Sequence, residues 1–211
     1  SSSINGLLYV RGQAEDFGGW RQMGNEGWGW EDVLPYFKKA ESWQGVDSED
    51  RGTSGPLTVS PTRAGRDLVD YWIESAVNAG YKKNPDYNSG DQEGVGYFQL
   101  TQRGGLRCSS AKAYLKPLRD SKNLDVITHA QAEKVIISEG RVTGVVANIR
   151  GRSKTIKARK EVVLCAGSIG SPQILMLSGV GDLEKLKSVG IAGVKHLPGV
   201  GKNLQDHLQA R

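Results

Sequence analysis

The sequence predicts a mixed α/β fold, and three patterns along its 211 residues support this prediction. Residues 125–165 are rich in β-branched side chains and are divided by glycine turns, which is typical of antiparallel strands. Residues 65–80 carry apolar side chains at helical spacing. Residues 166–178 pass through a glycine turn into a second helix. The strand-rich region alone would also fit a small sandwich, but the abrupt change to a turn and a helix favours a crossover in an α/β fold.

The first part of the chain, residues 1–60, is rich in glycine and tryptophan. We expect one helix near residues 31–41 and a loop over residues 45–55. Pro35 must lie in the first turn of that helix or kink it, because proline has no backbone N–H. A carbohydrate-stacking platform is one interpretation of the tryptophans, but packing in the core or beneath a lid is favoured, since tryptophan is mostly buried. These residues are Trp20, Trp28, Trp30 and Trp43.

The second part, residues 61–120, begins with an amphipathic helix that we expect to pack on a sheet and to end at Gly80. A strand is predicted over residues 95–101, followed by a polar turn and a short helix capped at Ser109 or Ser110. The apolar positions of the amphipathic helix are Leu68, Val69, Trp72, Ile73, Ala76 and Val77.

The third part, residues 121–211, is predicted to form mostly strands before it changes to helices. The last strand is expected to be buried. The helix that follows should begin at Ser171-Pro172, because serine is a good cap and proline fits the first helical position. The expected strands are residues 125–128, 132–138, 142–150, 155–158 and 161–165. The later elements are a helix over 182–190, a short strand and a loop over 198–201.

Two stretches at opposite ends of a predicted domain have the composition of loops that approach an anionic ligand. Residues 1–12 (SSSINGLLYVRG) open with three hydroxyl side chains and an Asn-Gly step, so their backbone can come close to such a ligand. Residues 167–181 (GSIGSPQILMLSGVG) follow a predicted strand and lead into a helix, whose N-terminus faces negative charge. Backbone amides of both loops are predicted to converge on one dinucleotide. Alone, residues 1–6 would be an ordinary polar turn.

Composition and charge argue against other classes of function. The net charge is a mild +5, and the clearest basic cluster has no aromatic residue to stack a base. A solvated hairpin face is therefore favoured over a nucleic-acid site. No apolar run is long enough to span a bilayer, and no signal peptide is recognisable. The basic cluster comprises Arg150, Arg152, Lys154, Lys157, Arg159 and Lys160.

Cysteines and histidines are too few and too scattered for a disulfide framework or a metal site. Cys165 is expected to be inert packing at the end of a strand. His129 is expected at a strand end and His196 on the surface. A direct catalytic role for His207 is not favoured.

Six segments, in order, resemble those of the glucose-methanol-choline (GMC) oxidoreductases, an FAD-dependent family that includes choline and glucose dehydrogenases. Residues 1–12 resemble the back part of the family's N-terminal signature, and residues 167–181 resemble its second signature. The likeness covers essentially the whole chain and implies the central part of a GMC-type FAD-binding fold, with a β-meander crossover and part of the substrate domain. The other segments are Gly27–Glu41 (GWGWEDVLPYFKKAE), Arg107–Pro117 (RCSSAKAYLKP), Asn123–Ala130 (NLDVITHA) and Leu197–His207 (LPGVGKNLQDH).

The resemblance implies a role for each part of the chain. Residues 1–60 would supply the FAD-contacting loop, a lid and a connecting segment. Residues 61–120 would form part of the substrate-binding domain, and residues 121–211 the FAD-binding domain. The strand over residues 95–101 corresponds to one near the family's substrate cavity, although its polar side chains are not expected to touch substrate.

The cofactor implied is non-covalent FAD. The matching positions are an Asn-Gly loop beneath the flavin, a strand position whose backbone pairs with adenine, and the turn at the end of a strand. Ile4 stands where some choline-oxidising members place a histidine bonded to the flavin, so no covalent link is expected. The residues expected to contact FAD are Asn5, Gly6, Leu7, Leu8, Ala132, Gly167 and Ser168.

The activity implied is oxidation of a small-molecule alcohol to an aldehyde or ketone by hydride transfer to the flavin. The resemblance places the family's catalytic histidine pair C-terminal to Arg211. The family's G-x-G-x-x-G turn does not occur in these residues either, because the GxG triplets at Gly27, Gly94, Gly179 and Gly199 lack the third glycine. We therefore expect an internal fragment with no catalytic residue of its own, weak FAD binding and no turnover.

Two alternatives stay open: a mandelonitrile lyase-like enzyme of the same fold, and a non-catalytic binding protein on the same scaffold. The sequence identifies neither the alcohol nor the electron acceptor. The localisation is unknown, and a mitochondrial or a secreted protein is compatible with the residues.

Overall fold

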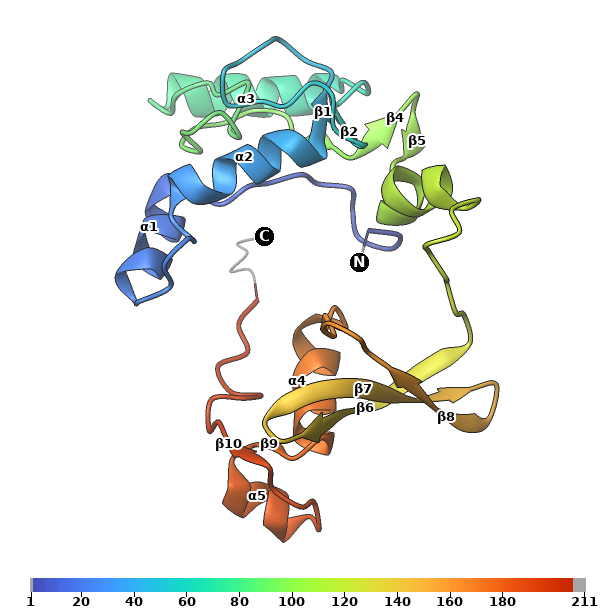
Figure 1. The fold of residues 1–211 in the computed structure, drawn as a ribbon. Helices are drawn as coiled ribbons and strands as arrows, with labels where there is room; N and C mark the ends of the chain where they lie inside the picture. Colours follow the sequence, from blue (N-terminus) through green and yellow to red (C-terminus); the bar gives the residue numbers. More distant parts are fainter. Residues whose placement is uncertain (1, 207–211) are drawn as a thin grey trace. The chain divides into compact units, whose positions relative to one another are not determined.

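A computed structural model describes residues 2–206 of the chain (Figure 1). Ser1, His207 and Arg211 lie outside the described residues. The expectations for them stay predictions, including the position of the family's histidine pair beyond Arg211.

The chain divides into two compact units, with the boundary between Leu124 and Asp125. Each unit contains helices and strands, which confirms the mixed α/β class. The assignment of roles to three parts of the chain stays a prediction.

The first unit is built around a small sheet. Its elements are α1 (Ala14–Gln22), α2 (Trp30–Ala40), β1 (Glu41–Trp43), β2 (Leu57–Pro61), α3 (Asp67–Asn78), β3 (Gln99–Leu100), β4 (Gln102–Arg103), β5 (Leu106–Arg107), the π-helix η1 (Ala111–Leu115) and the 3₁₀ turn η2 (Lys116–Leu118). The sheet has the order β1-β2-β3. β1 is parallel to β2, β3 is antiparallel to β2, and β4 and β5 form a separate hairpin.

The helix α2 confirms the expectation for residues 31–41, and residues 45–55 form the expected loop. Pro35 lies in the second turn of α2 instead of the first. The helix α1 was not predicted. Both helices begin in the same way, because an aspartate three residues after the cap accepts a hydrogen bond from the cap N–H: Asp16 from Gln13 at 2.8 Å and Asp32 from Gly29 at 3.0 Å.

The helix α3 occurs where helical spacing predicts it, but the prediction that it packs on a sheet is wrong. Ile73 is its buried residue, whereas Leu68 is 80% exposed and Trp72 is 63% exposed. The chain after α3 is mostly irregular and offers no sheet to cover the apolar stripe. The strand expected over residues 95–101 is reduced to β3, since glycine at positions 94 and 96 weakens strand pairing.

The four tryptophans have different environments. Trp43 is buried, as expected, and its indole N–H donates to the Val46 carbonyl at 2.8 Å. Trp20 is 46% exposed and Trp28 is 53% exposed, so the expected burial of these two side chains is only partial. Their rings lie 5.9 Å apart, at one end of an aromatic cluster that also contains Phe17, Trp30 and Phe37.

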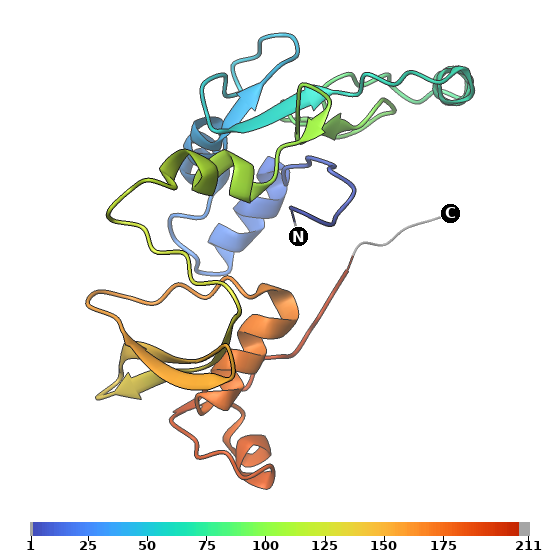
Figure 2. The ribbon, with the colours of Figure 1, turned by 90° about the vertical axis from the view of Figure 1, so that its right-hand side faces the viewer.

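The second unit contains the predicted meander. Its elements are β6 (Ala130–Ser138), β7 (Arg141–Ile149), β8 (Arg152–Lys157), α4 (Gly167–Leu177), β9 (Val180–Gly181), α5 (Leu183–Ser188) and β10 (Lys195–His196). The antiparallel sheet has the order β6-β7-β8, and α4 packs against β6 (Figure 2). β9 and β10 pair in parallel on either side of α5. The predicted helix over 182–190 is confirmed as α5 and is capped by Asp182.

Both hairpins of the meander turn at the predicted positions. Glu139 and Gly140 have φ of 52° and 76°, and Arg150 and Gly151 have φ of 52° and 83°. Two consecutive residues with positive φ form the type I′ turn that suits the twist of a β-hairpin, and glycine adopts this conformation without strain. His129 precedes β6, as expected for a strand end, and its carbonyl accepts from the Arg150 N–H at 3.0 Å.

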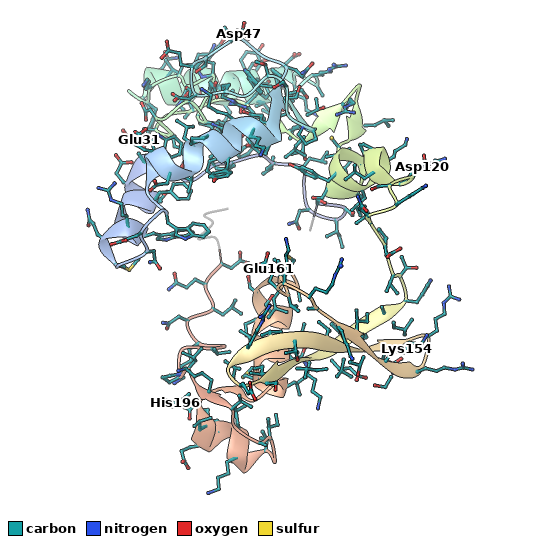
Figure 3. All side chains as sticks on the ribbon, in the orientation of Figure 1. Glu31, Asp47, Asp120, Lys154, Glu161 and His196 are labelled. Carbon is teal, nitrogen blue, oxygen red and sulfur yellow. The ribbon has the colours of Figure 1, made fainter. Side chains whose placement is uncertain are left out.

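The basic cluster is a solvated face, as the sequence predicts. Every residue of β8 is exposed, including Lys154 (Figure 3). His196 is exposed as well.

Two expected strands of the second unit are not formed. Residues 125–128 and 161–165 have no strand partner within residues 2–206, and Val163 is 73% exposed. Cys165 is exposed, so its interpretation as inert packing in a buried strand is wrong. Apolar, β-branched residues favour a strand, but the strand itself requires a hydrogen-bonded neighbour.

The helix α4 begins one turn earlier than predicted, at Gly167 instead of Ser171. The Ser171 hydroxyl still serves the helix start, because it accepts from the Ala166 N–H at 3.1 Å.

Candidate functional site

The predicted ligand loop, Asn5–Leu8, is held through its own carbonyl groups, which accept hydrogen bonds from the β4-β5 hairpin and its flanking residues. The Nη1 atom of Arg107 donates to the Ser2 carbonyl at 3.1 Å and to the Asn5 carbonyl at 2.8 Å. Hydrogen bonds from a charged donor are stronger than neutral ones. The Ser2 hydroxyl also accepts from the Ser110 N–H at 3.0 Å. The segment from Arg107 to Ser110 therefore fixes the start of the loop.

The second half of the loop is held beside β3. The Leu7 carbonyl accepts from both the N–H and the hydroxyl of Thr101, at 2.9 and 3.1 Å. The Tyr9 N–H donates to the Gln99 carbonyl at 2.9 Å. Leu7 has a φ of 71°, an uncommon conformation for a residue with a branched side chain. Such strained conformations persist where surrounding contacts determine them, and they cluster at ligand sites.

The other face of this loop is open among the described residues. A Cβ atom placed on Gly6 would meet no heavy atom of residues 2–206 within 4 Å, apart from its two chain neighbours. Ile4 is 83% exposed and Leu8 is 51% exposed. The loop thus has its carbonyls fixed on one side and small or apolar groups uncovered on the other, a geometry that fits a flat ligand lying against the backbone.

A buried polar network lies behind the loop. Glu41 accepts from Arg11 and from Arg51, each at 2.5 Å, and the side chains of all three residues are 1% exposed or less. Arg51 also forms an ion pair with Asp86, with its Nη1 atom 2.6 Å from Oδ1 of the aspartate. The guanidinium of Arg51 also lies 3.9 Å from the ring centroid of Trp43.

This network connects to the loop through Asn88 and Tyr87. The Asn88 side chain accepts from the Arg11 N–H at 2.7 Å and donates to the Tyr9 carbonyl at 3.0 Å. The Tyr87 hydroxyl donates to the same carbonyl at 2.9 Å. The chain that leaves the loop is therefore anchored in the interior.

Gln99 belongs to this buried polar network. It is 2% exposed, and its side chain bonds Arg51, Asn88 and Asp86 at 2.7 to 2.8 Å. Tyr97 donates to the Asp70 carboxylate at 2.8 Å. The expectation that the polar side chains of this strand do not touch substrate stays a prediction.

The remaining predicted contacts lie in the second unit. Gly167 and Ser168 form the first turn of α4, where the N-cap residue Ala166 makes no side-chain hydrogen bond to the first turn and no acidic residue is present. The N–H groups of an uncapped helix start suit an anionic group. Ala132 lies in β6, the edge strand of the described sheet, where every second residue turns its backbone groups away from the neighbouring strand.

The structure thus brings Asn5, Gly6, Leu7 and Leu8 together in one loop, and Gly167 and Ser168 together at one helix start. The loop and the helix start belong to different units. Their convergence on a single ligand stays a prediction.

Ionisable groups in the described residues offer no metal site. No group of three or more His, Cys, Asp or Glu side chains within residues 2–206 could hold a metal ion. Burial raises the pKa of Tyr9 and that of Tyr87, so both phenols are neutral at physiological pH. No helix in this range is long and apolar enough to cross a membrane.

Sequence reasoning missed the residues that support the loop. Arg107 begins one of the recognised segments, but nothing in its spacing links it to Ser2 and Asn5. Arg11 lies 30 residues before Glu41 and Arg51 lies 10 residues after it, and charged residues are usually exposed. Their pairing could be recognised only once the fold was known.

Solved structures have a similar fold. The pyridoxine 4-oxidase of Mesorbium loti superimposes with a TM-score of 0.88 and is 31% identical, over 94% of this chain and 39% of that one. An FAD-dependent oxidoreductase of Chaetomium thermophilum has a TM-score of 0.89 and is 27% identical, over 94% of this chain and 37% of that one.

Curated relatives match the sequence over nearly its full length. The oxygen-dependent choline dehydrogenase of Rhizobium johnstonii is 44% identical, and that of Sinorhizobium fredii is 46% identical, each over 99% of this chain. The chain spans 38% of the length of these relatives. The family model described as GMC oxidoreductase matches residues 1–209. With the glycine loops and the meander in the family's order, these matches establish that the chain belongs to the GMC oxidoreductases.

Proposed function

We propose that the complete protein carrying this chain is an FAD-dependent oxidoreductase that converts a small alcohol, of the choline type, to an aldehyde. The observation that carries the proposal is the loop Asn5–Leu8, whose carbonyls are fixed by Arg107 and Thr101 while Gly6 faces open space. The curated relatives, named oxygen-dependent choline dehydrogenases, support the substrate class.

The residues of this chain fit the cofactor. Asn5 to Leu8 would hold the flavin ring, and the first turn of α4 at Gly167 and Ser168 would face the anionic part of the nucleotide. The backbone of Ala132 would contact adenine. When bound, FAD supplies the acceptor for the hydride that leaves the carbinol carbon.

The tasks of these residues are binding and orientation. The fixed loop holds its ligand in one position, which lowers the entropy cost of reaching a reactive geometry. The apolar side chains of Ile4 and Leu8 would exclude water from the ring edge they cover. Ile4 has no nucleophilic atom, so we propose that the flavin is not covalently attached at this position. No residue of the chain is assigned the proton-transfer step.

The proposal is tested on the purified complete protein. We expect flavin absorbance that is bleached by choline under anaerobic conditions, and FAD that is released intact when the protein is precipitated with acid. A flavin that is not reduced by choline or another alcohol would favour the lyase of the same fold. A protein without flavin, which also fails to bind added FAD, would contradict the proposal.

Gly6→Ala distinguishes ligand contact from folding. Because no residue of 2–206 other than its two chain neighbours lies within 4 Å of the added methyl group, the variant should unfold at the wild-type urea concentration. It should nevertheless bind FAD several-fold more weakly, since the methyl group would meet the ring. Wild-type FAD affinity in this variant would place the flavin elsewhere.

A further inference from the structure

Arg107 supplies hydrogen bonds from a charged side chain to the start of the ligand loop. Its Nη1 atom donates to the carbonyls of Ser2 and Asn5, which are three residues apart. One guanidinium nitrogen thus closes the turn between them. Arg107 has no carboxylate partner among the ion pairs of residues 2–206, so its charge is directed at the loop.

The geometry favours an organising role over a role in global stability. Arg107 is only partly buried, and both of its side-chain hydrogen bonds are at exposed positions. The buried network of Arg11, Glu41 and Arg51 anchors the chain after the loop independently of it. Loss of Arg107 would release the start of the loop and leave the interior intact.

On this basis we propose that Arg107 is a positioning residue for the cofactor. It holds the carbonyls of Ser2 and Asn5 toward the hairpin and thereby keeps the opposite face of the loop, at Gly6, turned toward the flavin. The proposal rests on the proposed function, because it takes FAD as the ligand of this loop.

Arg103 provides a matched control from the same hairpin. It pairs with the position before Arg107 across the β4-β5 ladder. Its guanidinium donates to the Thr58 hydroxyl at 2.8 Å and to the Pro56 carbonyl at 3.0 Å, so it fixes β2 and not the loop. Arg103→Gln removes the same charge and a similar pair of hydrogen bonds.

The experiment compares Arg107→Gln, Arg107→Lys and Arg103→Gln in the complete protein. FAD affinity is measured by quenching of FAD fluorescence on titration with apoprotein, and stability by the urea midpoint of the apoprotein. We expect Arg107→Gln to raise the dissociation constant of FAD at least about tenfold, as expected for the loss of charged hydrogen bonds. Arg107→Lys should lie between this variant and the wild type, because the ammonium group can supply two donors from a shorter side chain.

The outcomes separate positioning from stability. The proposal is supported if both arginine-to-glutamine variants lose similar stability while only the Arg107 variant loses FAD affinity. It is overturned if Arg107→Gln binds FAD like the wild type, or if Arg103→Gln weakens FAD binding equally. A wild-type protein that binds no FAD contradicts the proposed function itself, and this inference with it.

Thr101→Val tests the same idea if Arg107→Gln does not fold. The change keeps the side-chain shape and the Thr101 N–H bond to Leu7, and it removes the hydroxyl bond to the same carbonyl. A two- to fivefold rise in the FAD dissociation constant is expected, from roughly half to one kcal/mol for one neutral hydrogen bond. Unchanged affinity in both Thr101→Val and Arg107→Lys overturns the proposal.

Discussion

Glu41 and Arg51 form an ion pair that is closed to solvent on both sides, with Oε1 of the glutamate 2.5 Å from Nη2 of the arginine. The second oxygen of Glu41 accepts from Arg11, from Nε of Arg51 and from the Gly52 N–H. One carboxylate therefore organises the end of α2, the loop after β1 and the chain that leaves the ligand loop. The buried charges are compensated by close geometry and by hydrogen bonds.

The first prediction is that Glu41→Gln strongly destabilises the protein. The amide keeps the size of the side chain but removes the carboxylate that pairs with the buried Arg11, and it leaves the buried Arg51 with Asp86 alone. Breaking a buried pair in this way costs about 3–5 kcal/mol. The measurement is the free energy of unfolding from urea titration followed by tryptophan fluorescence.

Asp91 provides the control for Glu41. It pairs with Lys82 at 2.7 Å, but both side chains are more than half exposed. Exposed ion pairs contribute little to the free energy of unfolding, so Asp91→Asn should leave the urea midpoint nearly unchanged. Equal effects of the two substitutions would show that burial does not decide the strength of these pairs.

The second prediction concerns Gly52. A Cβ atom at this position would lie 1.9 Å from the Lys38 carbonyl oxygen in α2. Gly52→Ala must therefore displace backbone, and it should lower the unfolding free energy by about 1–3 kcal/mol as other overpacked substitutions do. Gly18→Ala, which meets no atom within 4 Å in α1, is the comparison. It should be neutral or slightly stabilising, since alanine favours helices, and a Gly52 variant as stable as this one would contradict the steric argument.

Local patterns in the sequence predicted much of the fold. Helical spacing identified α3, and the positions of Gly140 and Gly151 identified both hairpin turns. These elements depend on a few neighbouring residues, so the sequence specifies them directly. The expected strand over residues 161–165 failed because its formation depends on a partner strand, which local composition does not reveal.

The candidate site was predictable only in part. The Asn-Gly loop and the glycine turn at Gly167 were recognisable as sequence motifs. The residues that hold the loop, Arg107 and Thr101, come from a hairpin about a hundred residues further along the chain. Such contacts are set by topology, and a single sequence carries no signal for them.

The third prediction is a loss of stability at alkaline pH through Tyr87. Burial raises its pKa above the ordinary value of 10.0, and its hydroxyl donates to Tyr9 and accepts from the Gln99 N–H. A raised folded-state pKa means that the neutral phenol contributes its full stability below pH 10. That contribution is lost as the pH rises through the folded-state pKa.

Tyr87→Phe should therefore be less stable than the wild type at pH 8, because it loses these hydrogen bonds, and should lose less additional stability between pH 9 and 11. Urea titrations across this range measure both effects. Tyr36, which is 70% exposed, is the control, and Tyr36→Phe should keep the wild-type pH dependence. A pH profile of Tyr87→Phe that parallels the wild type would assign the alkaline loss to another group.

The fourth prediction concerns the contact between α4 and the meander. The buried Ser178 hydroxyl donates to the Ile174 carbonyl at 2.6 Å and accepts from the Val135 N–H in β6 at 2.8 Å. Ser178→Ala would leave that buried N–H without its acceptor, at a cost of about 1–3 kcal/mol. Ser188→Ala removes an exposed hydroxyl that donates to the Lys185 carbonyl in α5, and it should cost much less.

Amide hydrogen exchange gives the direct measurement, because the Val135 amide should exchange faster in Ser178→Ala and at the wild-type rate in Ser188→Ala. Unchanged protection of Val135 in both variants would mean that packing alone holds α4 against β6.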